Sequence, residues 1–355
     1  MKIIHTSDIH LDSAMQSGLS PERARIRRSE LMAAFSLLVD HAKSEGASAV
    51  IIAGDLFDHG EITAKVRRFV IEKVESCPET EFFVLFGNHD AGSFSFSDKL
   101  PENMKLFSDS WRSYELPGVT VSGVELTEEN AERVYSELGL DADKTNIVVM
   151  HGAAGSSAGE DKVNVKALAD RGIDYLALGH YHSYEKKKLD RRGIYVYSGC
   201  LEGRGFDECG EKGFVELEIE NGNIKHSFVP FAQRQIHEIE VDFTDAATYS
   251  EQKTRVTQAA EGIASSDILR IRAIGKLRPE DQKFFDQIEK ELADSFFAFE
   301  IKDRVGVLID KNEYIGDISL KGEFIRLVSE KVKDEDERNE IIAFGLASLL
   351  GGDLQ

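Results

Sequence analysis

Short apolar runs alternate with longer amphipathic stretches along the first part of the chain. Residues 2–6, 48–55 and 81–88 are apolar runs of strand length, whereas 21–44 and 62–76 carry apolar residues at helical spacing. The order strand, helix, strand, helix, strand is typical of an α/β structure. The sequence therefore predicts a layered α/β core that begins close to residue 1.

More strands follow without long helices between them. The pattern predicts them over 119–125, 146–152, 174–180 and 193–199. Residues 214–231 predict a β-hairpin, because Asn221-Gly222 separates two alternating runs and is a strong two-residue turn signal.

The pattern changes after about residue 232. Strand-like runs at 236–243, 268–275 and 296–305 alternate with helical patterns at 248–263 and 280–293, which predicts a small α+β domain. Residues 320–352 predict two amphipathic helices. We expect three parts: a core over 1–232, a capping domain over 233–310, and a C-terminal helical segment over 311–355.

Composition narrows the class of protein. The 355 residues are 41% hydrophobic and 30% charged, with three cysteines, which predicts a soluble globular protein without a disulfide framework. No apolar run reaches membrane-spanning length and no signal region opens the chain, so we expect a cytoplasmic protein with no membrane contact. The net charge of −21 argues against coating nucleic acid by bulk attraction. It leaves a nucleic-acid enzyme possible, since bound metal ions supply local positive charge.

Side chains of the metal-ligand type follow five of the predicted strands. In chain order they are Asp8, His10, Asp55, Asn88, His151, His180 and His182. Oxygen ligands with imidazoles, and no thiolate, suit two divalent ions such as manganese, iron or zinc. On an extended segment, strand alternation would place His180 and His182 on one face. Any one motif alone is common at strand ends, but the five together in this order are specific.

The motifs D-x-H, GDxxD, GNHD, H and GHxH resemble those of the calcineurin-like metallophosphoesterases. "HTSDIHLD", "AGDLFDHG" and "GNHD" are most similar to the SbcD-type nuclease subunits and the YhaO-like DNA repair exonucleases. The resemblance covers about residues 1–230. It implies an α/β fold in which helices flank a two-sheet β sandwich, with the metal ions at the sheet edges. A small α+β cap domain and a C-terminal helical tail would follow.

The resemblance also implies a role for each ligand. Asp8, His10, Asp55 and His182 would hold one ion, and Asp55, Asn88, His151 and His180 the other, so that Asp55 bridges them. Manganese is the expected metal, with iron, zinc and magnesium as alternatives.

The resemblance makes His89 a catalytic residue rather than a ligand. It would donate a proton to the leaving oxygen or clamp the phosphate, with Asp58 or Asp90 orienting it. A turn-capping role is an equal alternative for Asp90. Arg204 and His59 are candidate substrate contacts; the alternatives are a structural ion pair for Arg204 and plain loop surface for His59.

The expected function is a metal-dependent phosphodiesterase, a hydrolase that acts on DNA in repair as a 3′–5′ exonuclease and as an endonuclease. The expected partners are an SMC-like ATPase, bound through the C-terminal helices, and a second copy of the chain. For those helices, packing on their own domain is an equal alternative. Two other functions stay open: hydrolysis of cyclic nucleotides or other small phosphoesters, and an adaptor whose metal site is only structural.

Overall fold

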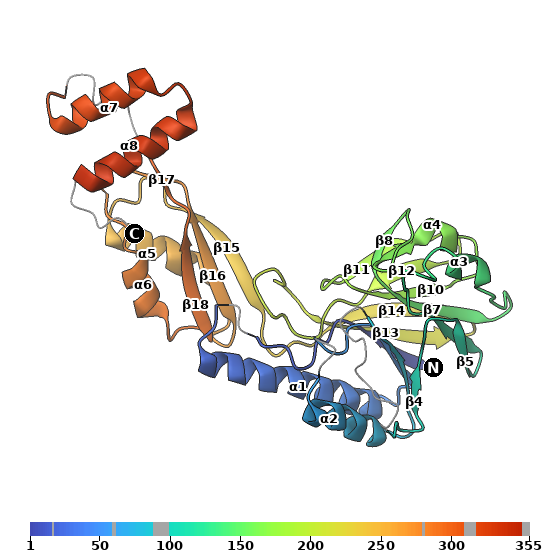
Figure 1. Ribbon diagram of the computed structural model, residues 1–355. Helices are drawn as coiled ribbons and strands as arrows, with labels where there is room; N and C mark the ends of the chain where they lie inside the picture. Colours follow the sequence, from blue (N-terminus) through green and yellow to red (C-terminus); the bar gives the residue numbers. More distant parts are fainter. Residues whose placement is uncertain (16–17, 59–61, 88–98, 279–280, 309–316, 350–355) are drawn as a thin grey trace. The chain divides into compact units, whose positions relative to one another are not determined.

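The computed structural model describes residues 1–15, 18–58, 62–87, 99–278, 281–308 and 317–349 (Figure 1). The chain forms two compact units, Met1–Ile236 and His237–Gln355. Each unit is described by itself below.

The first unit contains two six-stranded sheets. The first sheet has the order β14-β13-β1-β2-β3-β4, with β14 Asn223–Pro230, β13 Gly213–Glu220, β1 Lys2–Thr6, β2 Ala49–Ala53, β3 Glu81–Leu85 and β4 Met104–Leu106. The second has the order β11-β12-β10-β7-β6-β5, with β11 Glu185–Lys188, β12 Ile194–Tyr197, β10 Tyr175–Gly179, β7 Thr145–His151, β6 Val119–Gly123 and β5 Arg112–Leu116.

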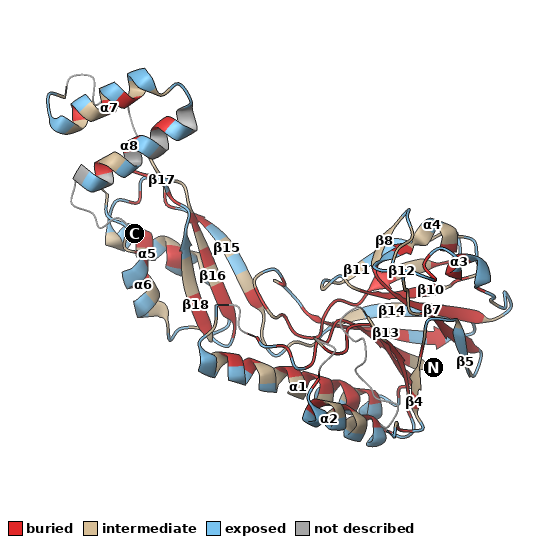
Figure 2. Ribbon diagram, in the orientation of Figure 1, coloured by how far each residue is buried: buried red, intermediate tan, exposed pale blue. Residues whose placement is uncertain are grey.

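The central strand β2 shows how the layers are held together. All five of its residues are buried, because both faces of the strand are covered. Val50 and Ile52 pack in the cluster that contains helix α1 (Pro21–Ser44) and helix α2 (Ala64–Glu75). Ile51 packs on the opposite face, in a cluster shared with the second sheet. The predicted two-sheet sandwich flanked by helices is therefore confirmed, and Figure 2 shows buried residues (red) along its strands, for example β7.

The outer face of the second sheet has its own cover. Its cluster contains Val148, Leu176 and Tyr197 from the sheet. Above them lie short elements that the sequence did not predict: α3 Val134–Glu137, α4 Val165–Leu168, β8 Ala153–Gly155 and β9 Lys162–Asn164. Each of these elements has only three or four residues, which is too short for periodicity to show.

The predicted hairpin is confirmed. β13 and β14 pair antiparallel, from Gly213 opposite Pro230 to Glu220 opposite Asn223. Asn221 and Gly222 have φ of 50° and 79°, which is the double left-handed geometry of a type I′ turn.

The second unit contains a three-stranded sheet in the order β15-β16-β18. The elements are β15 Ile236–Asp242, α5 Tyr249–Ala259, β16 Ile268–Ile274, β17 Lys276–Leu277, α6 Phe285–Leu292, β18 Ala298–Asp303 and β19 Gly306–Val307. Phe243, Val256, Ile271 and Ile288 lie in its core. The predicted order of strands and helices in this segment is confirmed.

Two helices complete the second unit, as predicted. They are α7 Leu320–Lys331 and α8 Glu335–Leu349, and they pack through Ile325, Val328, Ile342 and Leu346. Within the described part of the chain, no helix is both long enough and apolar enough to cross a membrane.

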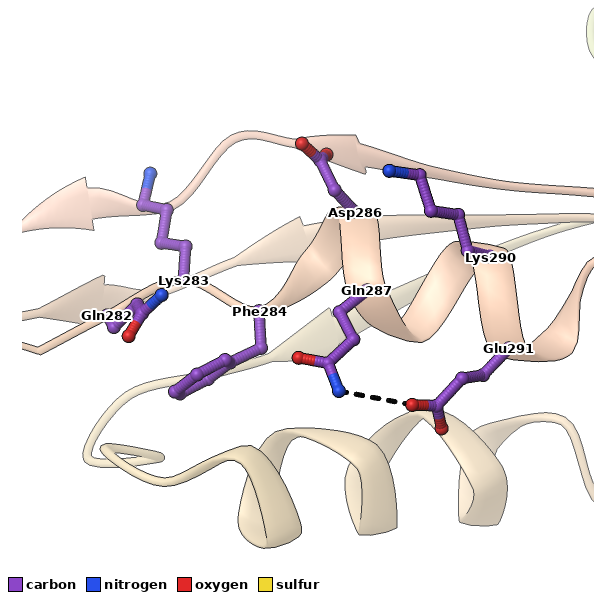
Figure 3. Close-up of a pocket in the computed structure, with 7 residues that line it drawn as sticks. All are labelled: Gln282, Lys283, Phe284, Asp286, Gln287, Lys290 and Glu291. Carbon is purple, nitrogen blue, oxygen red and sulfur yellow. Dashed lines mark hydrogen bonds between the residues drawn. The ribbon is translucent and has the colours of Figure 1, made fainter. Parts of the chain in front are cut away.

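A surface pocket lies beside α6 (Figure 3). Its lining residues are Gln282, Lys283, Phe284, Asp286, Gln287, Lys290 and Glu291. Lys283 pairs with Asp303 at 2.6 Å, and Glu291 pairs with Lys253 at 2.7 Å. These charges are thus already balanced by neighbours, which is typical of ordinary surface.

Candidate metal centre

The carboxyl ends of parallel strands from both sheets carry the predicted ligands. Asp8 and Asp55 lie two residues beyond β1 and β2, which are parallel neighbours. His151 is the last residue of β7, and His180 follows the last residue of its parallel neighbour β10. The two sheets meet here, because His151 Nδ1 lies 2.9 Å from the carbonyl oxygen of Ala53 in β2. The strand frames therefore bring distant side chains into one site.

Two groups of side chains could each hold a metal ion. Asp8, His10 and His182 form the first, and Asp8, Asp55 and His151 form the second, with the ligand atoms of each group within 4.8 Å of one another. Asp8 is common to both groups. Asp55 Oδ2 also lies 3.9 Å from His10 Nε2, so Asp55 lies beside both groups, and its bridging role stays a prediction.

The first group has the proton arrangement that a cation requires. His182 Nδ1 lies 2.6 Å from Glu208 Oε1, and His10 Nδ1 lies 3.3 Å from Asp58 Oδ1. A carboxylate at Nδ1 favours the proton there and leaves a lone pair on Nε2. The two Nε2 atoms lie only 3.3 Å apart. Two lone pairs that face each other at this distance fit a shared cation.

The second group shows the same fit. His151 Nδ1 faces the Ala53 carbonyl oxygen, so Nδ1 is the donor and Nε2 faces Asp55 Oδ2 at 3.3 Å. Both side chains are about 5% exposed or less. Burial by itself would lower the pKa of His151, but the interaction with Asp55 raises that pKa to about 9. The pair thus attracts positive charge, which a divalent ion would supply in place of the proton.

A ring of ion pairs fixes the imidazoles of the first group. Arg204 Nη1 lies 2.8 Å from Asp58 Oδ1, and Arg204 Nη2 lies 2.8 Å from Glu208 Oε1. The path His10–Asp58–Arg204–Glu208–His182 is therefore continuous through contacts of 2.6–3.3 Å. Each carboxylate holds one imidazole and is itself held by the guanidinium, which fixes both rings in place.

The two carboxylates of this ring stay charged. Burial raises the pKa of Glu208, but the hydrogen bonds from His182 and Arg204 outweigh burial and hold that pKa well below its usual value. Burial likewise opposes the ionised form of Asp58, yet His10 and Arg204 lower the pKa of Asp58 to about 2. Both groups are therefore anionic at any pH near neutrality.

Glu208 is the site residue that the sequence analysis missed. Its side chain is 3% exposed, and it accepts hydrogen bonds from His182, from the Arg204 side chain and from the Arg204 backbone N at 2.7 Å. Residues 204–208 form a turn rather than a helix, so the four-residue spacing from Arg204 carried no local signal that the two side chains would pair.

The remaining predicted site residues have mixed outcomes. The structure places Arg204 in the ion pairs described above with its side chain 19% exposed, and a phosphate contact stays a prediction. Asp58 contacts His10 and Arg204. Asn88, His89, Asp90 and His59 lie outside the described residues, so their predicted roles stay predictions. Beside the first group, a pocket of about 490 Å³ is lined by Ser13, Ala14, Met15, Asp58, Arg204, Gly205, Asp207 and Glu208.

The expectation of strand alternation at His180 and His182 was wrong. β10 ends at Gly179, and His180 has φ of 105°, which turns the chain out of the extended conformation. The ring of His180 lies 5.6 Å from that of His151, and the ring of His182 lies 5.1 Å from that of His10. The turn, rather than alternation, directs the two imidazoles toward different groups.

Strained backbone accompanies the ligands. Asp8, His10 and Asp55 have φ of 50°, 50° and 52°, in the left-handed region that costs a non-glycine residue about 1–2 kcal/mol. Such strain persists where the surrounding structure enforces it, and it clusters at functional sites. Gly87 has no room for a side chain, because a Cβ there would lie 2.1 Å from Asp55 Oδ1.

The chain belongs to the calcineurin-like phosphoesterase family, whose family model matches residues 1–184. Fold, paired ligand groups and family agree on a phosphoesterase, a metal-binding hydrolase.

Three relatives are similar to this chain over about two thirds of its length. It is 29% identical over 267 residues to the uncharacterized metallophosphoesterase YhaO of Bacillus subtilis, covering 69% of this chain and 64% of that one. It is 26% identical over 275 residues to the DNA double-strand break repair protein Mre11 of Aeropyrum pernix, covering 70% and 65%. The Mre11 protein of Methanopyrus kandleri is 24% identical over 278 residues, covering 68% and 59%. The matched region thus spans less than two thirds of each relative.

Proposed function

We propose that this protein is a divalent-metal-dependent phosphodiesterase that hydrolyses DNA in the course of repair in the cytoplasm, as a 3′–5′ exonuclease and an endonuclease. The observation that carries the proposal is the pair of adjoining ligand groups that share Asp8. The two relatives named as DNA double-strand break repair proteins support DNA as the substrate.

The ligand chemistry supports two ions, with manganese as the metal we propose. The groups offer only carboxylate oxygens and imidazole nitrogens, which suits manganese, iron and zinc. When bound, a pair of divalent ions neutralises phosphate oxygens and provides an activated water for in-line attack.

The chain's own residues position the reaction. Asp58 and Glu208 hold the imidazoles of His10 and His182 in one orientation, which leaves Nε2 of each ring facing the site. We assign proton donation to the leaving oxygen to His89, because imidazole titrates near neutrality. Asn88 as a ligand, Asp90 as an orienting group, and Arg204 and His59 as phosphate contacts complete the proposed site.

The helical hairpin formed by α7 and α8 supports a protein partner. Ile325 and Ile342 face its interior at 2% and 0% exposure, whereas Leu320, Leu327 and Phe344 are 70%, 47% and 63% exposed. Because this helix pair is apolar on its outer side as well as its inner side, the outer side is a surface that a partner protein could cover. We propose that this outer surface binds a coiled coil of an SMC-like ATPase, that the second unit's α+β part acts as a cap domain, and that the chain forms a homodimer.

One observation favours a second candidate, hydrolysis of cyclic nucleotides or other small phosphoesters. The net charge of −21 would repel a long polyanion, whereas a small diester carries a single charge. The same two ligand groups would serve either reaction.

A substrate panel with matched histidine variants tests the proposal. Metal content would be measured on the purified full chain, and hydrolysis of labelled duplex DNA, single-stranded DNA and cyclic nucleotides would be followed with Mn²⁺. His151→Gln should lose metal and activity together. His237→Gln is the control, because His237 lies in the second unit and pairs with Asp267 at 3.1 Å. Cleavage of cyclic nucleotides but not DNA would establish the second candidate. An inert wild-type chain with bound metal would favour an adaptor.

A further inference from the structure

An exposed aromatic ring stands between two of the site histidines. Tyr181 separates His180 from His182 in the chain and is 44% exposed. Its ring centroid lies 5.5 Å from that of His180. Exposed tyrosine is common, but here the ring contacts a histidine beside the candidate metal centre.

A buried tyrosine holds the ring in place. The ring of Tyr197 lies 4.7 Å from that of Tyr181 and is fully buried. The Tyr197 hydroxyl donates to Gly152 O at 2.9 Å and accepts from Ala154 N at 2.6 Å, so Tyr197 is a rigid floor. Tyr181 therefore contacts the rings of His180 and Tyr197 while much of its surface stays open to solvent.

Within the described part of the chain, no hydrogen bond of the Tyr181 hydroxyl explains the presence of this residue. Tyr175 and Tyr197 each use the hydroxyl in a hydrogen bond. Across the residues that the structure describes, Tyr181 makes no hydrogen bond through its side chain. The aromatic surface, rather than the hydroxyl, is thus the property that the site offers.

One basic side chain, Lys187, lies on the same face of the edge strand β11 as the tyrosine that Tyr181 contacts. Lys187 pairs with Glu185 at 2.6 Å and lies opposite Tyr195 in the β11–β12 pairing, and the ring of Tyr195 lies 6.5 Å from that of Tyr197. Lys186 and Lys188 alternate with Lys187 along β11, so they point to the opposite face of the sheet. Lysine on an edge strand also prevents sheet-to-sheet association. That role explains the charge but not the exposed ring beside the metal ligands.

We propose that Tyr181 is a stacking platform for the nucleobase next to the scissile phosphate, and that the favoured substrate is therefore nucleic acid with an unpaired base at the cleavage point. This inference rests on the proposed function and narrows its substrate class. Aromatic rings with neighbouring basic groups are the usual means of binding single strands, whatever the base. In an intact duplex both faces of a base are already stacked, so only a single strand or a frayed end can use the ring.

Two measurements on oligonucleotides test the platform. The first is hydrolysis with Mn²⁺ of a single strand with all its bases and of the same strand with an abasic residue at the cleavage point. The second is fluorescence anisotropy of labelled oligothymidylate and its abasic counterpart, with Ca²⁺ in place of Mn²⁺. The variants are Tyr181→Ala, which removes the ring, Tyr181→Phe, which keeps it, and Tyr181→Leu, which keeps apolar bulk without an aromatic face. Leu37→Ala removes an exposed apolar side chain from helix α1 and is the control.

The wild-type chain should prefer the base-bearing strand in both measurements. Stacking on one ring contributes about 1–3 kcal/mol. Tyr181→Ala should therefore raise Kd and KM for the base-bearing strand by about fivefold or more, and both constants for the abasic strand should stay unchanged. Tyr181→Phe should match wild type, and Tyr181→Leu should fail as Tyr181→Ala does.

Three outcomes would overturn the inference. Tyr181→Ala could leave the base preference intact, or it could weaken binding of both strands by the same factor. Alternatively, Tyr181→Leu could match wild type, which would show that apolar packing alone is responsible. The proposed function fails separately, if wild type binds oligothymidylate through Tyr181 yet cleaves no DNA. If wild type binds neither strand, both proposals fall.

Discussion

Replacing Glu208 by glutamine would test whether the ion-pair ring holds the metal site. The Glu208 side chain is 3% exposed and accepts from His182 Nδ1 at 2.6 Å and from Arg204 Nη2 at 2.8 Å. Glutamine has nearly the same size, but it is neutral and can offer only one acceptor oxygen in place of two. Either His182 or Arg204 would then lose its partner.

The expected loss follows from these contacts. Removing the carboxylate that orients a metal-binding histidine lowers metal affinity about 10- to 100-fold, which corresponds to about 1.4–2.7 kcal/mol. The metal-free chain should also unfold more readily, since a hydrogen bond to a charged group contributes about 1.5–3 kcal/mol. Asp58 stays paired with Arg204 at 2.8 Å, so the ring opens at one side without leaving the guanidinium alone.

Calorimetric titration of the metal-free chain with Mn²⁺ would measure the affinity, and urea denaturation would measure stability. Glu211→Gln is the matched control. It also removes one negative charge, but the Glu211 side chain is exposed and lies three residues beyond Glu208 in the chain. Wild-type affinity in Glu208→Gln, or an equal loss in the control, would refute the reasoning. A loss of stability with unchanged metal affinity would reduce Glu208 to a purely structural role.

Three further predictions concern the core, the glycine beside Asp55 and the helical hairpin. Burial lowers the pKa of His5 to about 3, so between pH 6.5 and 3 the unfolded chain binds a proton that the folded chain does not. The free energy of unfolding should therefore fall by about 1.4 kcal/mol per pH unit on acidification in that window. In His5→Leu, the slope of this free energy against pH, measured by urea denaturation, should be smaller by the contribution of one proton. An unchanged slope would contradict the prediction. Gly87→Ala should lower the Mn²⁺ content measured by mass spectrometry, because the new Cβ would lie 2.1 Å from Asp55 Oδ1. Gly155→Ala should leave the metal content unchanged, because a Cβ there would have nothing within 4 Å. Full metal content in Gly87→Ala would contradict the prediction. Phe344→Asp should abolish capture of an SMC-like coiled coil while hydrolysis and melting temperature stay unchanged, and a lower melting temperature would instead show that this ring packs on its own unit.

Local patterns predicted the elements well. Helix α1 has the predicted bounds, 21–44, because apolar spacing and a proline at its first turn act within a few residues of each other. The hairpin over 213–230 was likewise predictable, since Asn221 and Gly222 tolerate the left-handed turn that joins its strands. The convergence of Asp8, Asp55 and His151 at the strand ends could be predicted for a related reason. The carboxyl ends of parallel strands meet at one edge, so side chains there must come close together.

Contacts between distant residues decided the rest. The placement of β1 between β2 and β13 depends on pairing with a strand near residue 215, and no local period encodes such a partner. Glu208 became part of the site only because the fold brings it to His182 and carries Arg204 to Asp58. The turn at His180 is held from outside, by Asp8 Oδ1 accepting its backbone N–H at 3.0 Å. Periodicity reports what each segment buries, whereas orientation at the site depends on charges and hydrogen bonds that only the folded chain brings together.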